Sequence, residues 1–178
     1  MKNKKIYSLL VLFLILFFQK NLLSVKIDDN VEIAVIKTVI DGDTVILENG
    51  DKIRIIGINT PEIGKKEELY GIEAKEFAEK ILLNKKIYLE KDKKDFDKYG
   101  RKLRYIWLEI PEKITKGTIE EYNFSAIQLK NGFARTYTFK PNVKYLDYFK
   151  KIQKNAIKNK EGMWKEDIAK ITRGNSLR

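Results

Sequence analysis

Residues 41–62 read DGDTVILENGDKIRIIGINTPE, with two β-rich segments on either side of Asn49-Gly50. Asn-Gly is the preferred pair for a two-residue type I′ hairpin, because both turn residues must adopt a positive φ. With such a turn, Val45 is expected opposite Arg54. Asp43 then lies on the same face as Arg54, as a diagonal neighbour about 7–8 Å away. The stretch therefore predicts a β-hairpin that brings an aspartate and an arginine together.

Polar side chains gather at one end of this hairpin. Asp41 and Asp43 precede its first strand, and Asn59 and Glu62 follow its second strand. The two aspartates alone could be an ordinary polar turn. Arg54, however, lies within an apolar run, where a charge is costly without an anionic partner. That partner could be Asp43 in a structural ion pair, or a bound phosphate beside a hard divalent cation that the oxygens hold.

The rest of the chain completes a small mixed fold. Runs rich in valine and isoleucine and alternating patterns predict five strands, at 31–38, 44–48, 52–57, 86–90 and 102–109. Helices are predicted at 67–83, from a capping box at 118–121 to residue 131, and after a cap at Asn142. Because no alternation of strand and helix is sustained, a closed barrel is favoured over a parallel sheet. We therefore expect an α+β, mainly β fold: a five-stranded OB-type barrel with about three helices.

The amino-terminal residues 1–25 have the composition of a signal peptide, with a basic start and an apolar run at 6–18. A membrane helix needs roughly 20 apolar residues, so this run is short for a membrane span. We expect export and cleavage, which would leave residues 26–178 as one secreted, extracellular domain. The alternative is an uncleaved leader that anchors the domain to the outer face of the membrane through residues 6–23.

Composition narrows the possible functions. The chain has 36 Lys and Arg against 25 Asp and Glu, a formal net charge of +11. This excess favours an anionic partner such as nucleic acid or an anionic membrane surface, although a solvated lysine-rich surface would look the same. There is no histidine. Histidine-based nucleases, histidine-ligated zinc hydrolases and Ser-His-Asp hydrolases are therefore excluded, which leaves carboxylates, a metal and arginine as the available catalytic groups.

Two further segments combine basic and aromatic residues. Residues 97–101 read DKYGR and predict a tight turn that leads into the fifth strand. This turn is either a solvated hairpin tip or a nucleotide contact, in which Lys98 and Tyr99 meet phosphate and base and Arg101 is a second phosphate clamp. Residues 135–140 read RTYTFK. Their rings, Tyr137 among them, could stack on bases or belong to the core.

Taken together and in this order, these segments resemble the staphylococcal-type thermonucleases, a secreted nuclease family with an OB barrel. The resemblance covers about residues 32–167. It rests on IDGDTV at 40–45, IRIIGINTPE at 53–62, YGIEA at 70–74, DKYGR at 97–101, and on GFA at 132–134 and KPN at 140–142. It implies a calcium-dependent nuclease that hydrolyses DNA and RNA phosphodiester bonds and leaves 3′-phosphate ends. The substrates would be DNA and RNA, and we expect a monomer that needs no protein partner.

The resemblance also assigns roles by position. It implies catalysis by Arg54, Glu62 and Arg101, calcium binding by Asp43, Asn59 and the Thr60 carbonyl with Asp41 behind them, and nucleotide binding by Lys98, Tyr99 and Tyr137. Glu62 would be the general base, and the two arginines would hold the scissile phosphate. Asn59 stands where the founding member has a second aspartate. An amide brings no charge, so we expect weaker calcium binding.

Two functions of other classes remain open at this point. One is a nucleic-acid-binding OB module that has lost catalysis, as in family members that keep the barrel without the site. The other is a basic protein bound to an anionic membrane or cell wall, which would rest on charge and the leader alone.

Overall fold

The computed structural model describes residues 30–64, 68–165, 174 and 175. The leader at 1–25 and the alternative anchor at 6–23 lie outside these residues, so both stay predictions. No helix in the described part of the chain is long and apolar enough to cross a membrane.

A closed five-stranded barrel forms the centre of the molecule, in the order β1-β2-β3-β6-β5. Its strands are β1 (Val31–Asp41), β2 (Thr44–Leu47), β3 (Lys52–Ile55), β5 (Lys86–Glu90) and β6 (Lys102–Trp107). Neighbouring strands are antiparallel except β3 and β6, which pair in parallel and close the barrel. The predicted five-stranded OB-type barrel is therefore confirmed.

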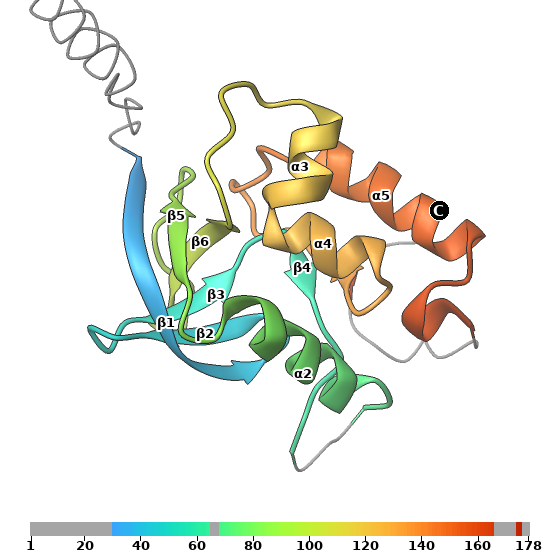
Figure 1. Cartoon of the computed structure of the whole chain (residues 1–178), viewed down its shortest axis with the longest axis horizontal. Helices are drawn as coiled ribbons and strands as arrows, with labels where there is room; N and C mark the ends of the chain where they lie inside the picture. The colour runs from blue at the N-terminus through green and yellow to red at the C-terminus, as the bar shows by residue number, and fades with distance from the viewer. Residues whose placement is uncertain (1–29, 65–67, 166–173, 176–178) are drawn as a thin grey trace, which may run out of the picture.

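Helices cover the barrel from two sides (Figure 1). The described residues hold four α-helices, α2 (Gly71–Leu82), α3 (Lys116–Tyr122), α4 (Phe124–Lys130) and α5 (Leu146–Lys158), and a 3₁₀ helix η1 (Gly162–Lys165). α2 packs against β1, whereas α4 lies between β6 and α5. A second, two-stranded sheet joins β4 (Ile58–Asn59) to β7 (Arg135–Thr136). We expected about three helices and did not predict this small sheet.

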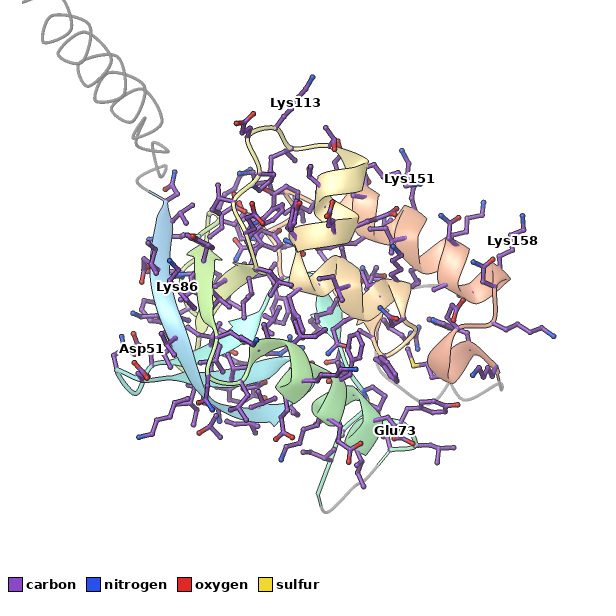
Figure 2. All side chains as sticks on the ribbon, in the orientation of Figure 1. Asp51, Glu73, Lys86, Lys113, Lys151 and Lys158 are labelled. Carbon is purple, nitrogen blue, oxygen red and sulfur yellow. The ribbon has the colours of Figure 1, made fainter. Side chains whose placement is uncertain are left out.

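The turn of the first hairpin is longer than predicted. Leu47 donates its amide to the carbonyl of Asp51 across 3.0 Å, so three residues rather than two form the loop. Asn49 accepts a hydrogen bond from the Asp51 amide at its side-chain oxygen, and Gly50 has the positive φ of 88° that this loop needs. Figure 2 shows Asp51 at the tip of the hairpin. The two-residue type I′ turn was therefore a wrong prediction.

The longer loop moves the register by one residue. Thr44, not Val45, lies opposite Arg54, and Val45 pairs with Ile53. Val45 and Ile53 are both fully buried, so this register places an apolar pair in the core.

The predicted helix from Thr118 to residue 131 is two helices. The capping box begins earlier than predicted: the Thr118 amide donates to Thr115 Oγ1 across 3.2 Å, and Thr118 Oγ1 accepts from the Thr115 amide. Asn123 then ends α3 and begins α4, where its side-chain oxygen accepts from the Ala126 amide. An asparagine that competes for backbone hydrogen bonds favours such a break.

Asn142 does not cap α5, because Tyr145 occupies the position before the helix. Instead, the Asn142 side chain accepts from the Lys94 amide across 2.7 Å and donates to the Lys94 carbonyl across 2.8 Å. The residue therefore ties the start of α5 to the segment between β5 and β6.

Gly57 is the glycine that the fold requires most clearly. It has φ +93°, and a Cβ atom there would lie 2.3 Å from the buried ring of Phe149 on α5. Gly57→Ala is expected to lower the free energy of unfolding by about 3 kcal/mol, from backbone strain and overpacking together. Urea unfolding would measure this. Gly50→Ala is the matched control, because it has a similar φ and open space. Equal losses in the two variants would contradict the packing argument.

Candidate active site

A pocket of about 760 Å³ lies at the end of the first hairpin. It brings together all ten residues that the sequence analysis singled out: Asp41, Asp43, Arg54, Asn59, Thr60, Glu62, Lys98, Tyr99, Arg101 and Tyr137. They come from the β1–β2 turn, β3, the segment from β4 to α2, the loop before β6 and the segment after β7. Their roles remain predictions, and the geometry below describes how each is held.

Arg54 on β3 is buried at the back of the pocket, with 4% of its side chain exposed. Its Nη2 lies 2.9 Å from Asp43 Oδ2 and donates to Asn59 Oδ1 across 3.1 Å, while Nη1 donates to the Ile55 carbonyl. The Phe139 ring covers the guanidinium at 5.0 Å. Burial lowers the pKa of Arg54, and the charge of Asp43 opposes that effect. The ion pair that the sequence suggested is therefore present, and it orients the guanidinium.

The β1–β2 turn places two carboxylates beside this arginine. Asp43 accepts hydrogen bonds from the Thr60 amide at Oδ2 and from the Thr44 hydroxyl at Oδ1. Asp41 Oδ1 accepts from the Asp43 amide across 2.9 Å. Burial and, next, the charge of Asp43 raise the pKa of Asp41 to about 6. The turn therefore concentrates negative charge, which a cation would relieve.

Gly42 lets the turn approach the segment after β4. A Cβ atom there would lie 2.6 Å from Thr60 Cγ2, so a side chain would separate the two segments. The carbonyl of Gly42 accepts from Gln128 Nε2 across 3.0 Å. Gln128 on α4 is fully buried and was not predicted as part of the site. Through this hydrogen bond, Gln128 stabilises the turn.

The donor groups fit a hard divalent cation. The carboxylates of Asp43 and Asp41 and the carbonyl of Thr60 are oxygen ligands, as calcium and magnesium prefer. Asn59 uses both ends of its amide inside the protein, because Oδ1 accepts from Arg54 and Nδ2 donates to the Thr60 carbonyl. Among the described residues, no cluster of three or more His, Cys, Asp or Glu side chains could hold a metal.

Glu62 follows β4 and lines the pocket. Its amide donates to Glu68 Oε2 across 3.1 Å, and its carbonyl accepts from the Glu68 amide across 2.8 Å. Gly71 leaves room for this arrangement, because a Cβ atom there would lie 2.6 Å from the Glu62 carbonyl. Glu68 thus holds the main chain of Glu62 on both sides.

Arg101 enters the pocket from the opposite wall. Its Nε lies 2.7 Å from Asp97 Oδ2, and its Nη1 donates to Thr44 Oγ1 across 3.4 Å. The same aspartate accepts from the amides of Tyr99 and Arg101 at Oδ1. The Tyr99 ring lies near two cations, 4.9 Å from Lys98 Nζ and 5.5 Å from the Arg101 guanidinium. With 71% of Tyr99 exposed, its ring can meet a ligand.

Tyr137 and Phe139 form an aromatic wall with ring centroids 4.8 Å apart. Both line the pocket, and Phe139 also packs against the core, while stacking of either ring on a base stays a prediction. Three more lysines line the pocket and were not predicted individually: Lys52, Lys94 and Lys140. Lys140 ends the basic and aromatic segment 135–140, whereas the only signal for Lys52 and Lys94 in the sequence was the excess of positive charge.

The arrangement can hold a phosphate between two guanidiniums, with a carboxylate and an oxygen-rich cation site beside it. Arginine suits this position because its planar fork matches two phosphate oxygens. The aromatic rings at the rim offer flat surfaces for the bases next to that phosphate.

Comparison with known proteins agrees with the fold. The sequence matches the family model described as Staphylococcal nuclease homologue over residues 52–166. It is 38% identical over 132 residues to the Thermonuclease of Staphylococcus hyicus, covering 71% of this chain and 72% of that protein. Endonuclease YncB of Bacillus subtilis is 32% identical over 164 residues, covering 88% of this chain and 68% of that protein. The Thermonuclease of Staphylococcus intermedius is 36% identical over 135 residues, 72% of this chain and 74% of that protein. The chain therefore belongs to the staphylococcal nuclease family.

Proposed function

We propose that this protein is a calcium-dependent nuclease that hydrolyses phosphodiester bonds of DNA and RNA and leaves 3′-phosphate ends. The observation that carries the proposal is the pocket itself, which brings Arg54 and Arg101 from two walls to one space beside Glu62 and the aspartates of the β1–β2 turn. The family, and relatives named thermonuclease and endonuclease, support the same conclusion.

The chemistry follows from the charges in the pocket. When water attacks a phosphodiester, negative charge grows on the non-bridging oxygens, and guanidiniums held in place stabilise that charge. Arg54 is oriented for this by Asp43, and Arg101 by Asp97. When bound, a hard divalent cation supplies further positive charge beside the same oxygens. Asp43, Asn59 and the Thr60 carbonyl would hold it, with Asp41 behind them.

Glu62 would take the proton from the attacking water as general base. The new bond joins that water oxygen to phosphorus, and the bond to the 5′ oxygen of the next nucleotide breaks, which leaves the phosphate on the 3′ side. The departing 5′ oxygen takes up a proton. Tyr99, Tyr137 and Lys98 would hold the nucleotide, and stacking on aromatic faces would accept any base. Such stacking would make cleavage tolerant of base sequence.

The basic test is cleavage of plasmid DNA, single-stranded DNA and RNA by the full chain and by residues 26–178. Reactions would contain calcium, magnesium or a chelator, and the product ends would be analysed. We expect cleavage with calcium, none with chelator, and 3′-phosphate ends. Binding of DNA without cleavage at every calcium concentration would instead identify a nucleic-acid-binding OB module.

Export is part of the proposal, since a secreted nuclease would meet nucleic acid outside the cell. The leader composition at 1–25 supports it. Amino-terminal sequencing of the protein from culture medium and from membranes would test it. A start near residue 26 in the medium supports secretion, whereas an intact leader in the membrane fraction supports the anchor.

Asn59→Asp is expected to raise calcium affinity by about tenfold, because affinity at such sites rises with the charge of the ligands. A carboxylate at this position can accept from Arg54 as the amide oxygen does, but it loses the hydrogen bond to the Thr60 carbonyl, so thermal unfolding would check the fold. Calorimetric titration with calcium would measure the change. Asn155→Asp, on the exposed face of α5, is the matched control, because it adds the same charge outside the pocket. An unchanged affinity in Asn59→Asp would refute the role of residue 59.

A further inference from the structure

Arg104 on β6 is a second buried arginine, and it does not line the pocket. Only 3% of its side chain is exposed. Its Nη1 donates to Asp95 Oδ1 across 2.5 Å and to the Leu103 carbonyl across 2.9 Å, and its Nη2 donates to Glu32 Oε1 across 3.1 Å. A buried charge is costly without well-placed partners, so these contacts decide where the surrounding chain can lie.

The two carboxylates bound to Arg104 belong to different parts of the molecule. Glu32 is on β1, inside the regular pairing with β5, and 53% of its side chain is exposed. Asp95 lies in the segment 91–101 between β5 and β6, which forms one wall of the pocket. Burial alone would raise the pKa of Asp95, but hydrogen bonds from Arg104 and Lys91 outweigh this effect and lower it. Arg104 is therefore a fixed bridge between the barrel and a pocket wall.

Backbone hydrogen bonds hold the turn 97–101 of this wall together: the Asp97 amide donates to the Arg101 carbonyl, and the Asp97 carbonyl accepts from the Gly100 amide. Asp95 accepts from the Leu103 amide at its carbonyl across 2.7 Å, and Asn142 holds the backbone of Lys94. Two residues after Asp95, the carboxylate of Asp97 binds the guanidinium of Arg101. A displacement of Asp95 would therefore reach Asp97 two residues further along the chain, and Arg101 through the Asp97 carboxylate.

We propose that Arg104 is a positioning residue of this enzyme. Through Asp95 it fixes the segment 91–101, and through that segment it sets where the Arg101 guanidinium meets the phosphate. Glu32 neutralises the same arginine but carries no part of the pocket. The inference rests on the proposed function for its effect on cleavage, while its effect on the position of the segment stands apart from catalysis.

Asp95→Ala and Glu32→Ala test this as a matched pair, because each removes one carboxylate from the same guanidinium. Displacing a catalytic group by about 1 Å can cost about 10²-fold in rate. We expect Asp95→Ala to lower kcat by about 10- to 100-fold with KM changed less than about threefold. Glu32→Ala should keep kcat. Thermal unfolding of both variants would separate a loss of stability from a loss of rate.

Amide hydrogen exchange gives a second measurement that needs no activity. The amides of Tyr99 and Arg101 both donate to Asp97 Oδ1, so their exchange reports on the order of the segment. We expect them to exchange about tenfold faster in Asp95→Ala and unchanged in Glu32→Ala. If the unaltered protein cleaves nothing, the proposed function fails, and this comparison still decides the inference.

Arg104→Lys is the further variant, because it keeps the charge but cannot reach Asp95, Glu32 and the Leu103 carbonyl together. It should behave as Asp95→Ala does, and it replaces that variant if Asp95→Ala does not fold. The proposal is overturned if kcat and amide exchange stay at the unaltered level in Asp95→Ala or Arg104→Lys. It is equally overturned if Glu32→Ala lowers kcat and speeds amide exchange as much as Asp95→Ala does.

Discussion

Glu62→Gln is expected to lower kcat by about 10²- to 10⁴-fold, the usual loss when a general base is removed. Glutamine has the same shape but cannot take a proton from water. Glu68 holds the main chain of Glu62 through its amide and its carbonyl, and these two hydrogen bonds are available to glutamine as well. Single-turnover cleavage of a labelled oligonucleotide would measure the rate, and thermal unfolding would confirm the structure.

Glu73→Gln is a suitable control for this variant. Glu73 is exposed on α2 and points away from the barrel in Figure 2, and it does not line the pocket. Loss of one negative charge there should leave kcat unchanged. If Glu62→Gln keeps more than about a tenth of the rate, another group takes the proton.

Arg54→Met is expected to change both stability and activity. It removes the proposed phosphate clamp, for which kcat should fall by about 10²- to 10³-fold. It also leaves Asp43 buried without its ion-pair partner, which typically costs about 3–5 kcal/mol. Urea unfolding and single-turnover cleavage would measure the two effects on the same preparation.

The double variant Arg54→Met with Asp43→Asn separates these effects. Replacing both charges of a buried ion pair is often close to neutral, so most of the lost stability should return. Cleavage should not return, because the clamp and a cation ligand are both missing. A double variant as unstable as Arg54→Met would mean that the stability lost in Arg54→Met does not come from the unpaired charge of Asp43.

The barrel could be predicted because its signals are local. Runs of β-branched residues marked the five strands, and β5 has the predicted bounds of 86–90. The details that failed depend on single polar side chains. Asn49 binds the Asp51 amide and lengthens the hairpin loop, and Asn123 divides one predicted helix into two. The sheet of β4 and β7 has two residues in each strand, too few to show an alternating pattern.

The site could be predicted as a set of residues but not as a structure. Its members lie in short polar motifs at the ends of strands, where they stand out. Gln128 and Asn142 act on residues far away in the chain, and nothing in their own surroundings indicates this. Arg104 did have a signal, since it is a charge inside the apolar strand 102–107, as Arg54 is in its own strand. The same argument applied to both would have singled it out.

The parallel pairing of β3 with β6 also affects when the pocket is completed during folding. Arg54 is on β3 and Arg101 directly precedes β6, so the two guanidiniums meet only when strands from distant parts of the chain have joined. Contacts between distant segments form slowly, whereas hairpins such as β2–β3 form within about 1–10 μs. An early folding species can thus contain the aspartates and one arginine without the other. In refolding experiments, the rate at which cleavage activity returns would therefore report the rate at which the barrel closes.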